Sequence, residues 1–364
     1  MTGGAAARFG FLVHPLDPGQ RRLLGVRTAD AGLIAGRSQL FPGPCEIATL
    51  SLRTARKTPL TGWLMALPDL PAQLIDEQER AVRDLAVAVR ACADRGATVV
   101  GLGALTALVG AHGRALAEVA AVPVTSGTAL TSWAAVETLA LARRHGVALG
   151  PLALFGLPGP AAMGIARLLA HRGLDFEAVL PTPNRVTERE LERLAVAGST
   201  RIRVRNDVEG ALAEGRVIVA ASSTGGRLPL SRVPRGAVIV DVAEPVDVLY
   251  DVPRREDVLV LDGELVSLPS PLTGTQPWTW VYGAVTGQRD ALFACFVEPM
   301  VIAAAQAPEL AGVGRDVPLE RVIALGAAAT AQGFTVRRLY ERGEPLREAR
   351  LRAFATGRPS IAPR

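Results

Sequence analysis

The sequence is poor in aromatic residues and in cysteine. Aromatic residues make up 4% of the 364 residues, so the core must be built mainly from Ala, Val, Leu and Ile, which suits buried parallel strands flanked by alanine-rich helices. The three cysteines, Cys45, Cys92 and Cys295, are scattered and odd in number, which argues against a disulfide framework, and no pair has metal spacing. We therefore expect no metal site and a reducing, cytoplasmic location.

Long hydrophobic runs are also missing. The longest apolar stretches, such as Val147–Gly156, are broken by Gly and Pro and fall short of the roughly 18 residues that a membrane span needs. Met1–Phe11 lacks the sustained apolar core of a signal peptide. The sequence predicts no integral membrane segment and no cleaved leader.

The charge balance is basic and rests almost entirely on arginine. The formal net charge is +5, which suits an acidic partner or a phosphorylated ligand, although genomic composition explains it equally well. The chain has no aromatic-interleaved basic strand, zinc-finger spacing or basic zipper, so we expect no nucleic-acid partner.

The length and the order of elements predict more than one domain. Single cores stop growing near roughly 250–300 residues, and strands alternate with helices through the middle of the chain, a pattern typical of a doubly wound parallel sheet. We predict an α/β fold with an N-terminal α/β substrate domain (1–130), a Rossmann-type domain (131–288) and a C-terminal helical segment (289–364). The expected helices include 74–95, 129–145, 291–307 and 319–332, and residues after Arg350 read as a mobile tail.

A glycine-rich turn lies where a strand meets a helix. Leu152–Phe155 reads as a strand and Pro160–His171 as a helix. Between them, Gly156 permits a tight turn and Gly159 the close approach of a pyrophosphate, while Ala162 replaces a third glycine where only a small residue is needed. This pattern predicts a dinucleotide phosphate loop. The alternative is a tight turn that binds nothing.

The end of the next strand bears on the choice of dinucleotide. An NAD site usually carries Asp or Glu about 20 residues on, against the ribose hydroxyls. Here Ala178–Leu180 runs into Pro181–Arg185 without an acid. Arg185 suits a 2′-phosphate and Asn184 the ribose, so we predict NADPH, unless Arg185 is a solvated loop residue.

Small polar residues follow two later strands. Ser222, Ser223 and Thr224 come after the strand Val217–Ala220, and such strand ends commonly face a cofactor in doubly wound sheets. Asp241 ends the following strand. We include all four residues in the predicted cofactor site, although Asp241 equally suits a turn cap.

The N-terminal domain offers a second cluster of small polar residues. A turn contains Gly103, and Thr125, Ser126 and Gly127 precede the predicted helix 129–145. Hydroxyls and backbone amides at this point can bind a carbonyl oxygen or a phosphate. We predict that these four residues bind substrate; for Thr125 and Ser126 an N-cap role is the alternative.

Cys295 and Glu298 lie one helical turn apart in Phe293–Pro299. A cysteine on an apolar helix is usually an inert buried residue, and a glutamate near a helix start is favoured by the helix dipole. In combination they suit a thiol nucleophile with an orienting or proton-carrying carboxylate.

The chain resembles the cyanobacterial-type long-chain acyl-[acyl-carrier-protein] reductases. The resemblance covers roughly residues 9–335 and rests most on Phe293–Phe296 with Glu298. Supporting matches, in order, are Phe9–Phe11, Gly101–Gly103, Thr125–Thr128, Gly156 with Gly159, Asn184–Arg185, Ile239–Asp241 and 324–334. The chain departs from the family in the proline-rich phosphate loop and in Asp262–Asp290.

The resemblance implies an enzyme that reduces an acyl thioester to an aldehyde with NADPH. It implies Cys295 as the acyl-accepting nucleophile and an acyl-carrier protein or coenzyme A thioester as partner; a homo-oligomer is compatible with it. Two alternatives stay open: a dehydrogenase related to shikimate or amino-acid dehydrogenases with direct hydride transfer, and a non-catalytic nucleotide-binding scaffold.

Overall fold

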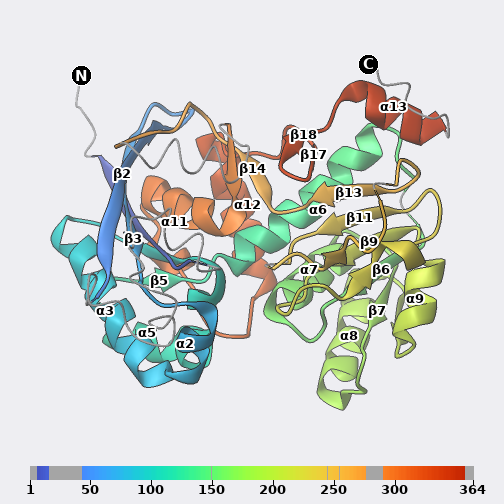
Figure 1. Ribbon diagram of the computed structural model, residues 1–364, viewed down its shortest axis with the longest axis horizontal. Helices are drawn as coiled ribbons and strands as arrows, with labels where there is room; N and C mark the ends of the chain where they lie inside the picture. Colours follow the sequence, from blue (N-terminus) through green and yellow to red (C-terminus); the bar gives the residue numbers. More distant parts are fainter. Residues whose placement is uncertain are drawn as a thin grey trace. The chain divides into compact units, whose positions relative to one another are not determined.

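The computed structural model describes residues 6–15, 43–148, 150–243, 245–253, 255–275 and 290–356. The chain divides into two compact units (Figure 1): unit 1 comprises 1–130, 267–315 and 324–335, and unit 2 comprises 131–266, 316–323 and 336–364. The predicted α/β class with a Rossmann-type sheet is confirmed. Residues 289–364, expected to be one C-terminal segment, are divided between the two units.

Unit 1 is built on a mixed sheet in the order β15-β2-β3-β1-β4-β5. Strands β1, β3, β4 and β5 run parallel, whereas β2 and β15 are antiparallel to their neighbours. The strands are β1 (Ala7–Val13), β2 (Cys45–Arg53), β3 (Pro59–Ala66), β4 (Val100–Leu102), β5 (Val124–Thr125) and β15 (Thr273–Gly274).

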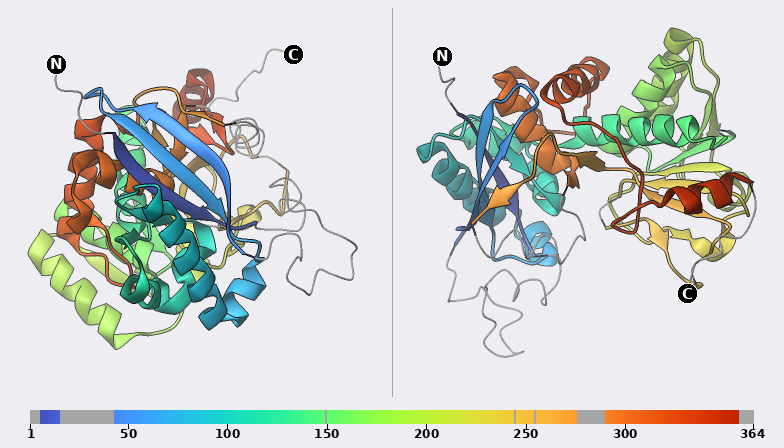
Figure 2. Two further views of the ribbon diagram at one scale, coloured as in Figure 1. Left: turned by 90° about the vertical axis from the view of Figure 1, so that its left-hand side faces the viewer. Right: turned by 90° about the horizontal axis from the view of Figure 1, so that it is seen from above.

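Successive residues of β1 pack against opposite layers of helices. Gly10 lies so close to Cys92 of α3 (Gln78–Asp94) that a Cβ there would stand 2.6 Å from the sulfur. Phe11 faces the other way and stacks on Phe296 of α11 (Ala294–Ala305), with the ring centroids 4.1 Å apart. The period of two places α3 on one face of the sheet and α11 on the other (Figure 2).

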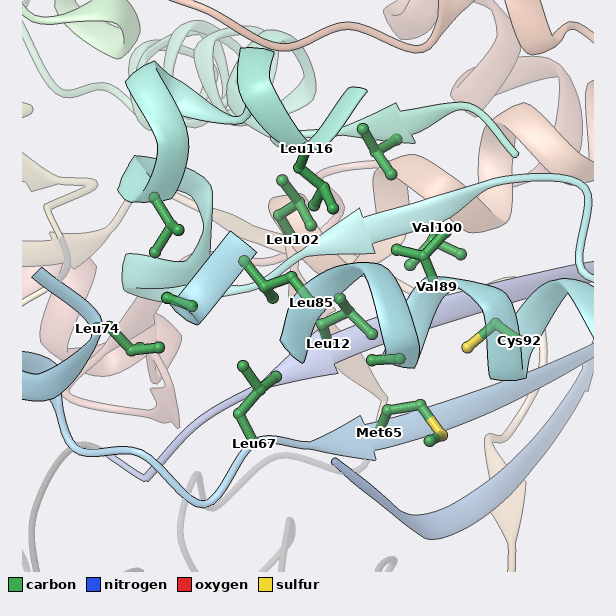
Figure 3. Packing of buried hydrophobic residues seen from close by; sticks show 14 of the residues in the cluster. Leu12, Met65, Leu67, Leu74, Leu85, Val89, Cys92, Val100, Leu102 and Leu116 are labelled. Atoms are coloured by element: carbon green, nitrogen blue, oxygen red, sulfur yellow. The ribbon is translucent and has the colours of Figure 1, made fainter. Parts of the chain in front are cut away.

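The core between the sheet and α3 is aliphatic, as the scarcity of aromatic residues requires. Figure 3 shows Leu85, Val89 and Cys92 of α3 against Leu12 of β1 and Val100 of β4, and all five side chains are fully buried. The other helices of unit 1 are α2 (Pro71–Asp76), α4 (Val109–His112) and α5 (Arg114–Val119); β16 (Ala291–Phe293) directly precedes α11.

Unit 2 is built on a six-stranded parallel sheet in the order β13-β11-β9-β6-β7-β8 (Figure 1). Numbered along the chain from β6, this order reads 3-2-1-4-5-6, the arrangement of dinucleotide-binding Rossmann domains. The strands are β6 (Leu152–Phe155), β7 (Phe176–Val179), β8 (Ile202–Arg205), β9 (Val217–Ala220), β11 (Val238–Asp241) and β13 (Leu259–Asp262).

Helices connect the first four strands of this sheet. They are α7 (Pro160–His171), α8 (Arg185–Gly198) and α9 (Val208–Glu214), and α13 (Glu348–Thr356) follows later in unit 2. Short strands complete it: β10 (Leu228–Pro229), β12 (Val248–Leu249), β17 (Tyr340–Glu341) and β18 (Glu344–Pro345). The elements α6 (Thr128–Arg144), α12 (Leu319–Gln332) and β14 (Leu265–Ser267) each contain residues of both units. No helix in the described part of the chain combines the length and apolar character needed to cross a bilayer.

Three local predictions are wrong. The expected helix 74–95 is interrupted at Glu77, whose ψ of 52° is not helical. The expected helix 291–307 begins as strand β16, and only Ala294 starts the helix. The expected tail after Arg350 is helical to Thr356, because Arg350 is buried and donates hydrogen bonds to the Glu256 and Val258 carbonyls at 2.6 and 2.7 Å.

The close packing of β1 on β3 predicts a specific cost for one side chain. A Cβ at Gly62 would lie 2.1 Å from the ring of Phe9, whereas one at Gly43 meets nothing. Gly62→Ala should therefore destabilise by about 1–3 kcal/mol through overpacking, and Gly43→Ala should not. Urea unfolding measures both. In a Phe9→Leu background the cost of Gly62→Ala should shrink; an equal cost would contradict this packing.

Candidate functional site

The predicted phosphate loop of unit 2 has the geometry that close approach requires. Gly156 has a φ of +103°, and a Cβ on it would lie 2.4 Å from the carbonyl oxygen of Ala221. The Gly159 N–H donates to the Gly156 carbonyl at 2.8 Å, and Gly159 forms the N-cap of α7. Ala162 is completely buried in α7, which explains why only a small residue fits there.

This loop lies at the switch point of the sheet. Strands β6 and β9 are neighbours, and Phe155 pairs with Ala220 at their carboxyl ends. Ligands of such sheets bind outside the carboxyl ends where the strand order reverses. The first turn of α7, after Pro160, adds backbone N–H groups and the positive end of a helix dipole, which favour an anion. The residues present therefore fit a dinucleotide pyrophosphate.

The segment after β7 is arranged by a helix cap. The Asn184 side chain accepts hydrogen bonds from the N–H groups of Val186 and Thr187, each at 3.1 Å. This is the N-cap geometry that Asn favours, so the oxygen expected to meet a ribose is engaged by α8. Arg185, the first residue of α8, is exposed and has no ion-pair partner among the described residues.

Hydrogen bonds join the segment after β9 to the segment after β11. Ser222 donates through both its N–H and its hydroxyl to Asp247, a fully buried carboxylate, with the N–H bond at 2.9 Å. Asp241 accepts N–H groups from Ala243 at 3.0 Å and Val248 at 2.9 Å. These contacts are those of a turn cap, which is the alternative role that the sequence predicts for Asp241.

Ser223 and Thr224 are exposed at the carboxyl edge of the sheet. The Thr224 hydroxyl accepts a hydrogen bond from Arg227 at 2.9 Å. Their contact with a cofactor stays a prediction.

The second candidate site lies in unit 1 at Cys295. This residue is in the first turn of α11, is partly exposed and is in no disulfide. Gly127, with a φ of +77°, packs directly on it: a Cβ at Gly127 would lie 2.3 Å from the Cys295 Cα. The structure thus brings together residues that are 168 positions apart and that the sequence analysis proposes separately, one as a nucleophile and the other as a substrate-binding residue.

Glu298 joins the two segments that form this site. Its carboxylate accepts hydrogen bonds from the Thr125 hydroxyl and from the Leu130 N–H, the latter at 2.8 Å. Leu130 is in the first turn of α6, so Glu298 caps that helix from α11. Because Glu298 is buried and spans both segments, we assign it the role of a positioning residue.

Of the two remaining predicted substrate residues, one lies near Cys295 and the other has a packing role. Ser126 belongs to the Cys295 site: its N–H donates to the Gly312 carbonyl at 2.9 Å, and its hydroxyl lies 3.0 Å from that of Thr128. Gly103 instead permits close packing, since a Cβ there would lie 2.6 Å from the Leu12 carbonyl. Sequence reasoning missed Gly312 and Asp247, which lie in loops without a motif.

Comparison with known proteins shows similarity to an aminotransferase. No protein-family model matches the chain. The chain is 26% identical over 360 residues to the aminotransferase PigE of a Serratia species, a match that covers 94% of this chain and 41% of the relative. The chain thus spans about two fifths of the relative's length. This similarity supports the prediction that the chain is an enzyme.

Solved structures resemble the chain only weakly. L-tryptophan dehydrogenase from Nostoc punctiforme has a TM-score of 0.35 at 11% identity, covering 97% of this chain and 87% of that one. Ornithine carbamoyltransferase from Pyrococcus furiosus has a TM-score of 0.39 at 11% identity, covering 70% and 79%. These likenesses carry no weight for function.

The expectation of acyl-thioester reduction to an aldehyde is wrong. It is contradicted by the similarity to an aminotransferase. The expected acyl-carrier or coenzyme A thioester partner loses its support as well. The resemblance to acyl-[acyl-carrier-protein] reductases stays a prediction to which this similarity adds nothing.

Pyridoxal phosphate, the cofactor that an aminotransferase suggests, does not fit this chain. Such enzymes hold the cofactor on a lysine as a Schiff base. The chain contains one lysine, Lys57, in the exposed turn between β2 and β3 with a φ of 63°. Because Lys57 is exposed, it is not held in a buried site of the kind that encloses an aromatic cofactor.

The three thiols should differ sharply in reactivity. Burial raises the pKa of Cys92 to about 12 and also raises that of Cys45, whereas Cys295 lies at a helix N-terminus, which favours an anion. Iodoacetamide at about pH 8 should therefore add once, at Cys295. Intact mass measures the adduct, and Cys295→Ser should abolish it. Equal labelling of Cys45 would contradict this assignment.

Asp241 should impose a pH dependence on stability. Burial, with a contribution from Asp247, raises its pKa from 3.8 to about 7, so the folded state keeps a proton that the unfolded chain has lost. Its contribution to stability is present near pH 4 and is lost as the pH rises to about 7.

Asp241→Asn should flatten this decline in the free energy of unfolding, measured by urea titration across that range. Asp251→Asn is the control, because hydrogen bonds from Ser231 lower the pKa of Asp251 from 3.8. The titration of Asp251 therefore affects stability mainly below this pH range, and the decline should remain in that variant. A decline unchanged in Asp241→Asn would refute the role of Asp241.

Proposed function

We propose that this chain is the dinucleotide-dependent part of an amino-transfer system: unit 2 binds NADPH, and unit 1 binds a carbonyl compound at Cys295. The observation that carries the proposal is the strand order of unit 2 with Gly156 against Ala221 at its switch point. The similarity to an aminotransferase supports the substrate class, because amino transfer forms and consumes carbonyl compounds.

The residues of unit 2 would hold the dinucleotide by its phosphates. Gly156 and Gly159 leave room for the pyrophosphate, and the N-terminus of α7 supplies N–H donors. Arg185, exposed at the start of α8, would pair with a 2′-phosphate through a charge-assisted hydrogen bond. When bound, NADPH supplies hydride chemistry.

The residues of unit 1 suit a carbonyl group. A thiol adds to a carbonyl carbon as a nucleophile, and negative charge that develops on the oxygen is favoured by nearby helix N-termini. Two such termini, those of α6 and α11, meet where Gly127 packs on Cys295. Glu298 keeps them together by accepting hydrogen bonds from Thr125 and Leu130.

Amino transfer itself we place outside this chain. Its one lysine is exposed in a turn, and the match covers 41% of the aminotransferase, which leaves most of that relative to carry its named activity. The proposed role here is therefore redox chemistry on a carbonyl compound that an aminotransferase forms or consumes.

Binding of NADPH tests the proposal directly. We expect saturable binding, measured by the change in NADPH fluorescence, and a loss of at least about tenfold in Gly156→Ala, because the new Cβ would push Ala221 and close the phosphate loop. Gly173→Ala is the matched control: Gly173 also has a positive φ but open space around it. The wild-type chain failing to bind NADPH would overturn the proposal.

Arg185→Ala tests the choice of dinucleotide. The variant should bind NADPH about tenfold or more less tightly, because it loses a charge-assisted hydrogen bond, while its affinity for NADH changes little. Arg193→Ala removes another exposed arginine of α8 and should change neither affinity. Equal losses for NADPH and NADH in Arg185→Ala would show that Arg185 does not read the 2′-phosphate.

A further inference from the structure

Three basic residues gather in unit 1 beside the loop 311–315. The Gly314 N–H donates to the His112 carbonyl at 2.7 Å, which places His112 beside the segment that carries Arg315. Burial and the charges of Arg315 and Arg114 hold the pKa of His112 below its usual range. The Arg114 guanidinium rests on Gly314, where a Cβ would lie 2.8 Å from its Nε. Both arginines are exposed, and neither has an ion-pair partner among the described residues.

The backbone that carries His112 is strained. Gly110, Ala111 and His112 have φ values of 61°, 55° and 59°, a left-handed run that L-residues avoid. The segment is held by hydrogen bonds: the Gly110 N–H donates to Gln78 at 2.7 Å, and the His112 carbonyl accepts from the Gly314 N–H at 2.7 Å. Strain of this kind persists at sites where a side chain must be placed for function.

The same loop connects this cluster to the Cys295 site. The Gly312 N–H donates to the Thr125 hydroxyl at 3.2 Å, and the Gly312 carbonyl accepts from the Ser126 N–H at 2.9 Å. Ser126 precedes Gly127, which packs on Cys295. Arg315 is three residues beyond Gly312, a span of at most about 11 Å.

We infer that His112, Arg114 and Arg315 bind a phosphate monoester group on the carbonyl compound that reacts at Cys295. Two guanidinium groups without acidic partners match a dianion, and guanidinium recognises phosphate through paired hydrogen bonds. A monoanionic carboxylate would leave one arginine uncompensated. The inference rests on the proposed function, since it adds a recognition group to the proposed carbonyl site.

The charge of an alkylating agent tests the electrostatic link to Cys295. Iodoacetate and iodoacetamide form the same S–C bond and release iodide, but only iodoacetate is anionic. In Arg114→Ala/Arg315→Ala, the rate with iodoacetate should fall by about twofold or more at low salt, because two positive charges that attract the anion are removed, and the rate with iodoacetamide should not change. Arg90→Ala, which removes an exposed arginine of α3, is the control.

Inorganic phosphate tests the binding site itself. Calorimetry should show phosphate binding to the wild-type chain and to Arg90→Ala, and a loss of about tenfold or more in the double variant. Unchanged phosphate affinity in the double variant overturns the inference. If the double variant loses phosphate binding but both of its alkylation rates equal those of the wild-type chain, the link to Cys295 is overturned.

NADPH affinity separates this inference from the proposed function. The double variant should keep wild-type NADPH affinity, because the phosphates of NADPH are assigned to unit 2. A parallel loss of NADPH binding would mean that the cluster serves the dinucleotide, which contradicts a substrate site. Failure of the wild-type chain to bind NADPH would overturn the proposed function while the phosphate titration still reports on the cluster.

Discussion

The contact on which unit 2 depends is the packing of Gly156 against the carbonyl of Ala221. It brings together the loops after β6 and β9, the two strands between which the strand order reverses. A side chain at position 156 would separate these loops and fill the space in front of α7. The parallel sheet, the helix N-terminus and the missing side chain therefore meet at one point, where we propose that the phosphates of the dinucleotide bind.

Unit 1 depends in a similar way on one buried carboxylate. Glu298 accepts hydrogen bonds from Thr125 and Leu130, and so fixes the start of α6 against α11. This places Gly127 on Cys295 and brings two helix N-termini to one thiol. Burying a carboxylate is costly unless donors satisfy it, which explains why it lies where a helix start supplies N–H groups.

The sequence predicts the local features well and the long-range ones poorly. The turn at Gly156 and the alternation of strands and helices suffice to predict the Rossmann sheet, because both are local patterns. The contact of Cys295 with Gly127 joins residues 168 positions apart, and no periodicity in the sequence predicts it. Contacts such as that of Asp247 with Ser222 join loops of irregular sequence, and the spacing of these residues does not predict such contacts. The function expected from the resemblance is contradicted by the similarity to an aminotransferase.

The central claim is that this chain binds a nicotinamide dinucleotide and leaves amino transfer to another part of a larger system. Native mass spectrometry of the chain, incubated with NADPH and pyridoxal phosphate together and then treated with borohydride, tests this most directly. We expect one NADPH per chain and no stoichiometric reduced adduct on Lys57. Stoichiometric pyridoxyl-Lys57 without bound NADPH would contradict the claim.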